Sequence, residues 1–184
     1  MKILSVVAAV AALAISMSAH AADKPELRIG SVVAMTGPAS ALGLPEKNAL
    51  ELLQEQLAND TSLPFTVKFI TYDDGSDPTK AVNNVRKLIT EDRAHVVICC
   101  TTTPTSMAIL ETVTQAKVPN ISLALAQSVI EPVKERHWIF KTPSTDQLQV
   151  TGLVDDMVKR GIKKVAFLGL EDSFGEGGWI AMQS

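Results

Sequence analysis

The sequence predicts an α/β fold, a doubly wound parallel sheet, with the start of a second α/β lobe behind it. Apolar, β-rich segments alternate with segments of helical periodicity four times along residues 27–126. The first segment, 27–35, is a nearly continuous apolar run, which indicates a strand buried on both faces. Loops rich in Gly, Pro, Asp and Thr follow the strand segments. This order is typical of a parallel sheet with ligand contacts at the carboxyl ends of its strands.

Residues 1–21 are predicted to be a secretory signal peptide. Lys2 precedes an apolar stretch over 3–15 and the small-residue site Ala19-His20-Ala21. The apolar stretch is too short to span a bilayer, which takes ~20 residues. No cysteine that could carry a lipid lies near this site. We therefore expect export and release of a soluble protein that begins at Ala22 or one residue later.

Residues 22–143 are predicted to form an N-terminal ligand-binding lobe. Thr36-Gly37-Pro38 ends the first strand, and a loop through Gly43 leads to Pro45, which suits the first turn of a helix. Asp77-Pro78 is a second helix-start signal. Further strands are expected over 65–72, 96–99, 118–126 and 138–141, and further helices over 78–91 and 104–117.

Residues 144–184 are predicted to be the incomplete start of a second lobe. A helix over 147–160, ended by Gly161, is expected to precede a buried strand over 163–170 and a glycine-rich loop over 171–178. Such a unit lacks most of its own sheet, so its apolar side chains should be exposed. These side chains include Phe167, Leu168, Leu170, Trp179 and Ile180.

Composition excludes several kinds of site. The formal net charge is −3 and basic residues form no cluster, so no nucleic-acid partner is expected. The three histidines are scattered, so neither a metal site nor a histidine-based nucleophile is predicted. No cofactor is expected. Cys99 and Cys100 are adjacent, where a bridge requires a strained ring, and we expect buried free thiols.

The segment that follows the third strand is rich in hydroxyl side chains. An apolar run ends at Cys99, and five hydroxyl side chains with one proline occupy residues 101–106. In one interpretation Thr102 or Thr103 caps the next helix, with Pro104 at its first position. In the other, the hydroxyls and the free N–H groups of the first helical turn bind a carboxylate. Local sequence leaves both interpretations open.

Several motifs in fixed order resemble one family. They are Ile29-Gly30 with Thr36-Gly37-Pro38 and Gly43, Val118-Pro119-x-Ile121-Ser122, Phe140-Lys141-Thr142 with Asp146, and Asp172-x-Phe174-Gly175-Glu176-Gly177. Together they resemble the type I periplasmic solute-binding proteins of branched-chain amino acid (Leu/Ile/Val-binding, LivJ/LivK-like) ABC transporters, from about residue 28 to the last residue. Pro45-Glu46-Lys47-Asn48 and Thr103-Pro104-Thr105-Ser106 are more similar to a subgroup that binds aromatic or other carboxylic acids.

The resemblance implies two lobes that close on a ligand, whose carboxylate is held by a hydroxyl after the third strand. That position falls on Thr103, with Thr101 and Thr102 beside it. A second hydroxyl, often found after the fourth strand, is replaced by Ala124 and Ala126. The remaining implied ligand-binding residues are Leu42, where amino-acid binders often have an aromatic residue, and Phe174 from the second lobe.

Two residues of the second lobe have alternative interpretations. Phe174 is equally well explained as a core aromatic residue, and Asp172 as a cap of its own loop. A ligand ammonium group would need such a partner. The replacement of polar and aromatic residues by Leu42, Ala124 and Ala126 makes the pocket more apolar, which argues against a free α-amino acid.

The function implied is that of the periplasmic substrate-binding component of an ABC transporter. It would bind a small carboxylate-bearing solute, either a branched-chain amino acid or an aromatic or aliphatic acid, and deliver it to the permease as a monomer without catalysis. A sensory ligand-binding domain of the same fold is an alternative. A nucleotide-cofactor enzyme is a weaker one, because the loop 36–43 lacks the glycine triplet that lets a backbone approach a pyrophosphate.

Overall fold

The computed structural model describes residues 24–184, so the predicted signal peptide lies outside the described residues. Five parallel strands form one sheet in the order β2-β1-β3-β4-β5. The predicted doubly wound α/β fold is thereby confirmed. The strands are β1 (Glu26–Val33), β2 (Thr66–Asp73), β3 (Val96–Cys99), β4 (Asn120–Ser122) and β5 (Ile139–Lys141).

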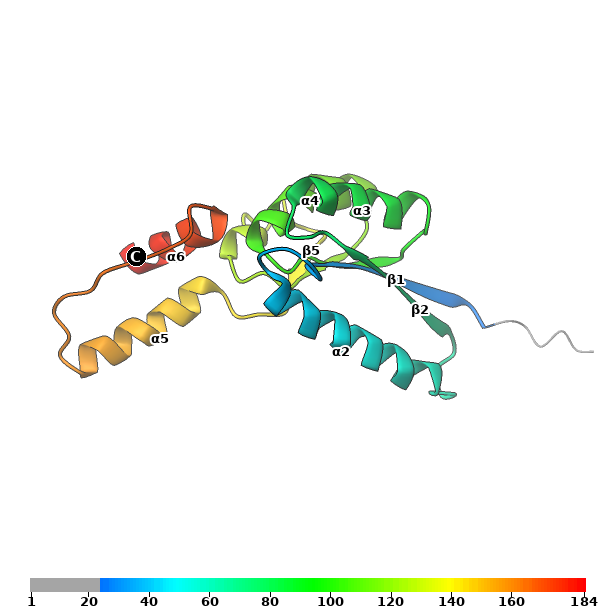
Figure 1. The fold of residues 1–184 in the computed structure, drawn as a ribbon, viewed down its shortest axis with the longest axis horizontal. Helices are drawn as coiled ribbons and strands as arrows, with labels where there is room; N and C mark the ends of the chain where they lie inside the picture. Colours follow the sequence, from blue (N-terminus) through cyan, green and yellow to red (C-terminus); the bar gives the residue numbers. More distant parts are fainter. Residues whose placement is uncertain (1–23) are drawn as a thin grey trace, which may run out of the picture.

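The helices lie on both faces of the sheet and beyond one end of it. One face is covered by α2 and the opposite face by α3 and α4, while α5 and α6 lie together outside the sheet (Figure 1). None of the helices among residues 24–184 is both long and apolar enough to cross a membrane. Their bounds are α2 (Ser40–Ala58), α3 (Pro78–Thr90), α4 (Thr103–Ala116), the short 3-10 helix η1 (Gln127–Val129), α5 (Asp146–Lys159) and α6 (Ser173–Gln183).

The core lies between the sheet and the layer formed by α3 and α4. The helix α3 contributes Val85 and Leu88, which are fully buried there. Leu88 packs directly over β1, where a Cβ at Gly30 would lie 2.8 Å from its Cδ1 atom. Gly30 therefore permits this contact. Burial of each such aliphatic side chain contributes about 1.5–3 kcal/mol to folding.

The first helix begins earlier than the sequence predicts. We expected a loop through Gly43 and a helix from Pro45, but α2 starts at Ser40 and Pro45 lies inside it. The reason is the close approach of Gly43 to the end of β1: a Cβ at this position would lie 2.1 Å from the carbonyl oxygen of Ala34. Glycine thus permits the first turn of α2 to rest on the backbone that follows β1.

The second unit differs most from its prediction. The expected strand over 163–170 is wrong: this segment has no regular secondary structure and is exposed, since no strand lies beside it within residues 24–184. The expected glycine-rich loop over 171–178 is also wrong, because α6 begins at Ser173. The predicted exposure of the apolar side chains is confirmed. Their exposed fractions range from 42% for Phe167 to 98% for Leu168.

Candidate functional site

A cavity of about 440 Å³ lies at the carboxyl ends of the strands. Its walls come from the loops that follow β1, β2, β3 and β4, and from residues 170–174 before and at the start of α6. The strand order reverses between β1 and β3, and the loops after these two strands supply most of the lining. In doubly wound sheets this is the position where ligands bind.

Most of the predicted binding residues line this one cavity. The structure brings six of them together there: Leu42, Thr101, Thr102, Thr103, Ala124 and Phe174. Ala126 lies apart. It is fully buried next to α6, where a Cβ at Gly177 would lie 3.7 Å from the Ala126 Cβ. The short, buried Ala126 side chain therefore belongs to the packing between the loop after β4 and α6.

The hydroxyl of Thr101 both accepts and donates a hydrogen bond within the protein. Its Oγ1 accepts a hydrogen bond from the Ala34 N–H at 2.9 Å and donates its proton to Oε2 of Glu46 at 2.5 Å. The side chain thus joins the loop after β3 to the end of β1 and to α2. A threonine hydroxyl carries one proton, and here Glu46 holds it.

Thr102 is the N-cap of α4. Its Oγ1 accepts from the Thr105 N–H at 3.3 Å and lies 2.8 Å from the Thr105 hydroxyl. Thr103 is then the first helical residue and Pro104 the second, one position later than expected. The capping interpretation is therefore correct for Thr102, and it frees Thr103 from that task.

Thr103 differs from both neighbours because its hydroxyl has no partner. The residue is only 2% exposed and lines the cavity, and its buried Oγ1 forms no hydrogen bond to the described residues. A buried hydroxyl without a partner costs about 1–3 kcal/mol. It stands in the first turn of α4, where the helix dipole favours an anion, although Pro104 has no N–H and the N–H of Thr105 is bonded to Thr102. The geometry can therefore accommodate a carboxylate at this point.

A pair of serines behind the cavity shapes the two loops. The Ser106 Oγ lies 3.0 Å from the Ser122 Oγ and accepts from the Cys100 N–H at 3.2 Å. Ser122 in turn accepts from the Ala124 N–H at 3.2 Å. All four residues are buried. The sequence pattern indicated no individual role for these serines, because Ser106 lay within the expected helix over 104–117 and Ser122 within the expected strand over 118–126, whereas the observed β4 ends at Ser122.

The two cysteines correct an expectation. Cys99 and Cys100 are both fully buried, as predicted, but they form a disulfide instead of two free thiols. The strand β3 ends at Cys99, so Cys100 already belongs to the loop and does not follow the alternation of side chains along a strand. The pair immediately precedes Thr101.

The loop after β2 places two neighbouring carboxyl groups in different surroundings. Burial acts to raise the pKa of Asp73, but hydrogen bonds from Thr36, Gly75 and Met35 outweigh it and hold this pKa below its usual value. Asp74 is fully buried, and its Oδ2 has no partner among the described residues. Burial raises the pKa of Asp74 above its usual value.

Glu46 extends this acidic group toward the cavity. Burial, and to a lesser degree the charge of Asp74, raise the pKa of Glu46, whereas the bond from Thr101 acts to lower it. The net direction is upward. Two carboxyl groups with raised pKa values therefore lie behind the lining residue Thr101.

The second-lobe residues Asp172 and Phe174 both line the cavity. Asp172 caps α6 by accepting from the N–H groups of Phe174 at 2.9 Å and Gly175 at 3.0 Å, so the capping alternative holds for it. Phe174 is 42% exposed and lines the cavity, which contradicts the alternative of a core aromatic residue. Its ring adds an aromatic surface to the lining.

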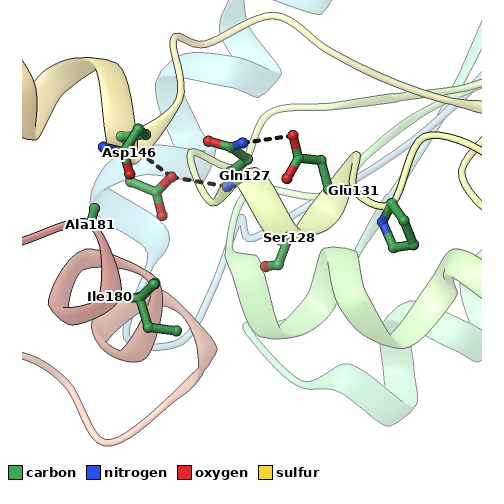
Figure 2. Close-up of a pocket in the computed structure, with 9 residues that line it drawn as sticks. Gln127, Ser128, Glu131, Asp146, Ile180 and Ala181 are labelled. Carbon is green, nitrogen blue, oxygen red and sulfur yellow. Dashed lines mark hydrogen bonds between the residues drawn. The ribbon is translucent and has the colours of Figure 1, made fainter. Parts of the chain in front are cut away.

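A second cavity, of about 490 Å³, lies between η1, the start of α5 and α6 (Figure 2). Asp146 is central to it: its Oδ1 accepts from the N–H groups of Gln127 at 3.1 Å and Gln147 at 3.0 Å. Gln127 also donates to Glu131 at 2.6 Å. In the part of the chain that the structure describes, no side chain lining this cavity has a buried polar atom without a partner. Asp146 thus ties α5 to the loop after β4, and the first cavity remains the candidate binding site.

Comparison with known proteins identifies the class. The chain belongs to the periplasmic binding protein family, whose sequence profile matches residues 26–182. The resemblance predicted from the motifs is confirmed. Both the family and the fold are those of solute-binding proteins. A search of curated protein sequences finds no match.

Solved structures agree with this assignment. An extracellular ligand-binding receptor from Rhodopseudomonas palustris is 35% identical, with a TM-score of 0.78 over 88% of this chain and 43% of its own. A solute binding protein of an ABC transporter from Rhodopseudomonas palustris BisB5, in complex with 3,4-dihydroxy benzoic acid, is 27% identical, with a TM-score of 0.77 over 86% and 43%. The leucine binding protein LivK from Thermotoga maritima shares the fold at 21% identity, with a TM-score of 0.75 over 85% and 44%. The chain therefore spans less than half the length of each of these structures.

Proposed function

We propose that the chain is the ligand-binding part of a periplasmic substrate-binding component of an ABC transporter, which captures a small carboxylate-bearing solute for import. The observation that carries this proposal is Thr103, which lines a cavity at the reversal of strand order from the first turn of α4 and whose buried hydroxyl has no partner among the described residues. A ligand carboxylate would satisfy this hydroxyl and interact favourably with the helix N-terminus.

The rest of the lining favours an apolar body on the ligand. Leu42, Ala124 and Leu125 contribute aliphatic surface, and Phe174 contributes an aromatic face. Among the described residues that line the cavity there is no lysine, arginine, asparagine or glutamine, and the one charged side chain, Asp172, is engaged as the cap of α6. Such walls suit a benzoate-type acid or a branched aliphatic acid better than a polar amino acid. The relative in complex with 3,4-dihydroxy benzoic acid supports the same class.

The organisation of the protein follows from the same proposal. Residues 22–143 form the first lobe, and residues 144–184 begin the second, which contributes Phe174 to the cavity. Lys141 donates to the Leu125 carbonyl and Asp146 accepts from Gln127, so both ends of the crossing segment are tied to the loop after β4. The solute reaches an ABC permease without chemistry at this site, and the protein acts as a monomer in the periplasm without cofactor or metal.

A ligand panel tests the solute class. Binding is measured by isothermal titration calorimetry and by thermal unfolding with 4-hydroxybenzoate, 3,4-dihydroxybenzoate and L-leucine. Each ligand is compared with its amide analogue, in which an amide group replaces the carboxylate. A ligand at 100 times its Kd should stabilise the protein by about 2.7 kcal/mol. At least one acid should bind while its amide does not. Equal binding of an acid and its amide, or binding of none of the acids, would contradict the proposal.

A further inference from the structure

We infer that Glu46 is a positioning residue of the anion site: it takes the hydroxyl proton of Thr101, withdraws Thr101 from ligand binding and leaves the ligand carboxylate to Thr103. This inference rests on the proposed function and deepens it. It assigns different roles to two threonines that line the same cavity and stand two positions apart. Glu46 itself does not line the cavity.

The direction of the Thr101 hydrogen bonds carries the argument. Its Oγ1 accepts from the Ala34 N–H at 2.9 Å and lies 2.5 Å from Oε2 of Glu46. An ionised carboxylate only accepts, so the Thr101 proton must point to Glu46 and away from the cavity. What Thr101 can present to the cavity is then a lone pair, which repels a carboxylate oxygen. Thr103 has no such acceptor, and its proton stays available.

The charges around Glu46 strengthen this division. Asp74, from the loop after β2, is fully buried and acts on Glu46, and Asp74 itself is faced by Asp73 and Asp77. The neighbouring cation on α2 is Lys47, which is paired with Glu51 at 2.7 Å. A ligand anion therefore meets negative charge behind Thr101 and the helix N-terminus at Thr103. Both effects direct the carboxylate toward Thr103.

Protonation of Glu46 reverses the direction of its hydrogen bond with Thr101. A protonated carboxyl group donates to the Thr101 Oγ1, which already accepts from Ala34, so the Thr101 proton turns toward the cavity. Thr101 then becomes a second donor to the anion. Ligand binding should therefore be linked to proton uptake at Glu46, and acid conditions should strengthen it beyond the trend set by the ligand's own titration.

Two substitutions at position 46 separate charge from proton direction. Glu46→Gln removes the charge but keeps a carbonyl oxygen that can still accept from Thr101. Glu46→Met removes the charge and the acceptor at similar volume, and so frees the Thr101 proton. Each of these variants is prepared in three backgrounds: with Thr101 unchanged, with Thr101→Val, which deletes the hydroxyl, and with Thr101→Ser, which keeps it. The probe is the tightest acid of the panel above, starting with 4-hydroxybenzoate.

The inference predicts a gain in ligand affinity at position 46 that depends on the hydroxyl at position 101. Glu46→Met should tighten binding about tenfold, because one hydrogen bond to a charged group is added, and Glu46→Gln should tighten it less. Thr101→Val should remove the extra gain of Glu46→Met, whereas Thr101→Ser should preserve it. As the pH falls and Glu46 takes up its proton, the ratio of the wild-type affinity constant to the Glu46→Met affinity constant should rise toward one.

The outcomes distinguish the two proposals. If the acids bind but Glu46→Met and Glu46→Gln give equal gains in every Thr101 background, the role of Glu46 is overturned and the proposed function stands. If no acid binds the wild type, the proposed function itself fails, and this inference fails with it. A carbon NMR titration of the Glu46 carboxyl adds a readout independent of ligand: Thr101→Val should raise its pKa, and an unchanged pKa would contradict the hydrogen bond on which the inference depends.

Discussion

The two regions of the chain, residues 24–141 and residues 142–184, bury their apolar side chains to very different extents. In the first region a five-stranded sheet is covered on both faces, and Val85, Leu88 and Val97 are fully buried. In the second region α5 buries no residue, and the segment before α6 leaves Leu168 98% exposed. The difference shows that apolar sequence alone does not make a core: a strand needs at least one partner strand, and its sheet needs helices that cover its faces.

The largest expected difference in stability is between alanine variants of two leucines, one from each region. Leu88→Ala should lower the free energy of unfolding by about 2–5 kcal/mol, because it leaves a cavity between α3 and β1. Leu168→Ala should change it by less than about 0.5 kcal/mol, since that side chain is already in solvent. Urea denaturation measures both. Equal losses would show that the two regions are packed alike.

Alanine substitution of one glycine in each region compares how closely the backbone is packed there. Gly43→Ala should destabilise by about 1–3 kcal/mol, because its Cβ would lie 2.1 Å from the Ala34 carbonyl oxygen, a backbone atom. Gly152→Ala in α5 meets nothing within 4 Å and should stabilise by about 0.5–1 kcal/mol through its helix preference. Thermal unfolding of both variants checks the opposite signs.

Hydrogen exchange should follow the same division. Amides of β1 and β3 lie in the centre of the sheet and should exchange only on global unfolding, whereas amides over 163–171 have no ladder partner and should exchange within the dead time of the measurement. Proteases should cut this segment first. Protection of 163–171 comparable to that of β3 would contradict the exposure seen in the structure.

Two adjacent carboxyl groups predict opposite trends with pH. The pKa of Asp73 is lowered by its hydrogen bonds, so its contribution to stability is present above the unfolded pKa and is lost as pH falls through the folded value. The pKa of Asp74 is raised by burial, so the folded state binds its proton more tightly and stability falls as pH rises from the unfolded toward the folded value.

Substitution by asparagine tests these signs. Asp74→Asn should stabilise the protein at neutral pH, and the gain should shrink as pH falls below the unfolded pKa. Asp73→Asn should destabilise at neutral pH and lose its effect in acid. Unfolding free energies measured across pH give both curves, and parallel curves for the two variants would show that burial does not distinguish these groups.

The sequence predicts the first region far better than the second. The bounds of β3 match the structure, and Asp77-Pro78 starts α3 as expected because both signals are local. The start of α2 depends on the contact of Gly43 with Ala34, and the strand expected over 163–170 depends on a partner strand. Such contacts between distant residues leave little trace in local pattern.

The same limit applies to the candidate site. The threonine loop could be found from its position after β3, and six of the seven predicted residues line one cavity. The different roles of Thr101 and Thr103 could not be found, because the partners of Thr101 are Ala34 and Glu46, far away in sequence. The disulfide of Cys99 and Cys100 was missed because a bridge between adjacent cysteines requires a strained ring, which argued for free thiols.

The most direct test of the account is the affinity of Thr103→Val for the acid that binds best. Valine keeps the shape of threonine and deletes only the unpartnered hydroxyl, so binding should weaken about tenfold to a hundredfold, with Thr103→Ser close to wild type. Stability should not fall, since the hydroxyl forms no hydrogen bond to the described residues. Unchanged affinity in Thr103→Val, measured by isothermal titration calorimetry, would contradict a carboxylate site at the start of α4.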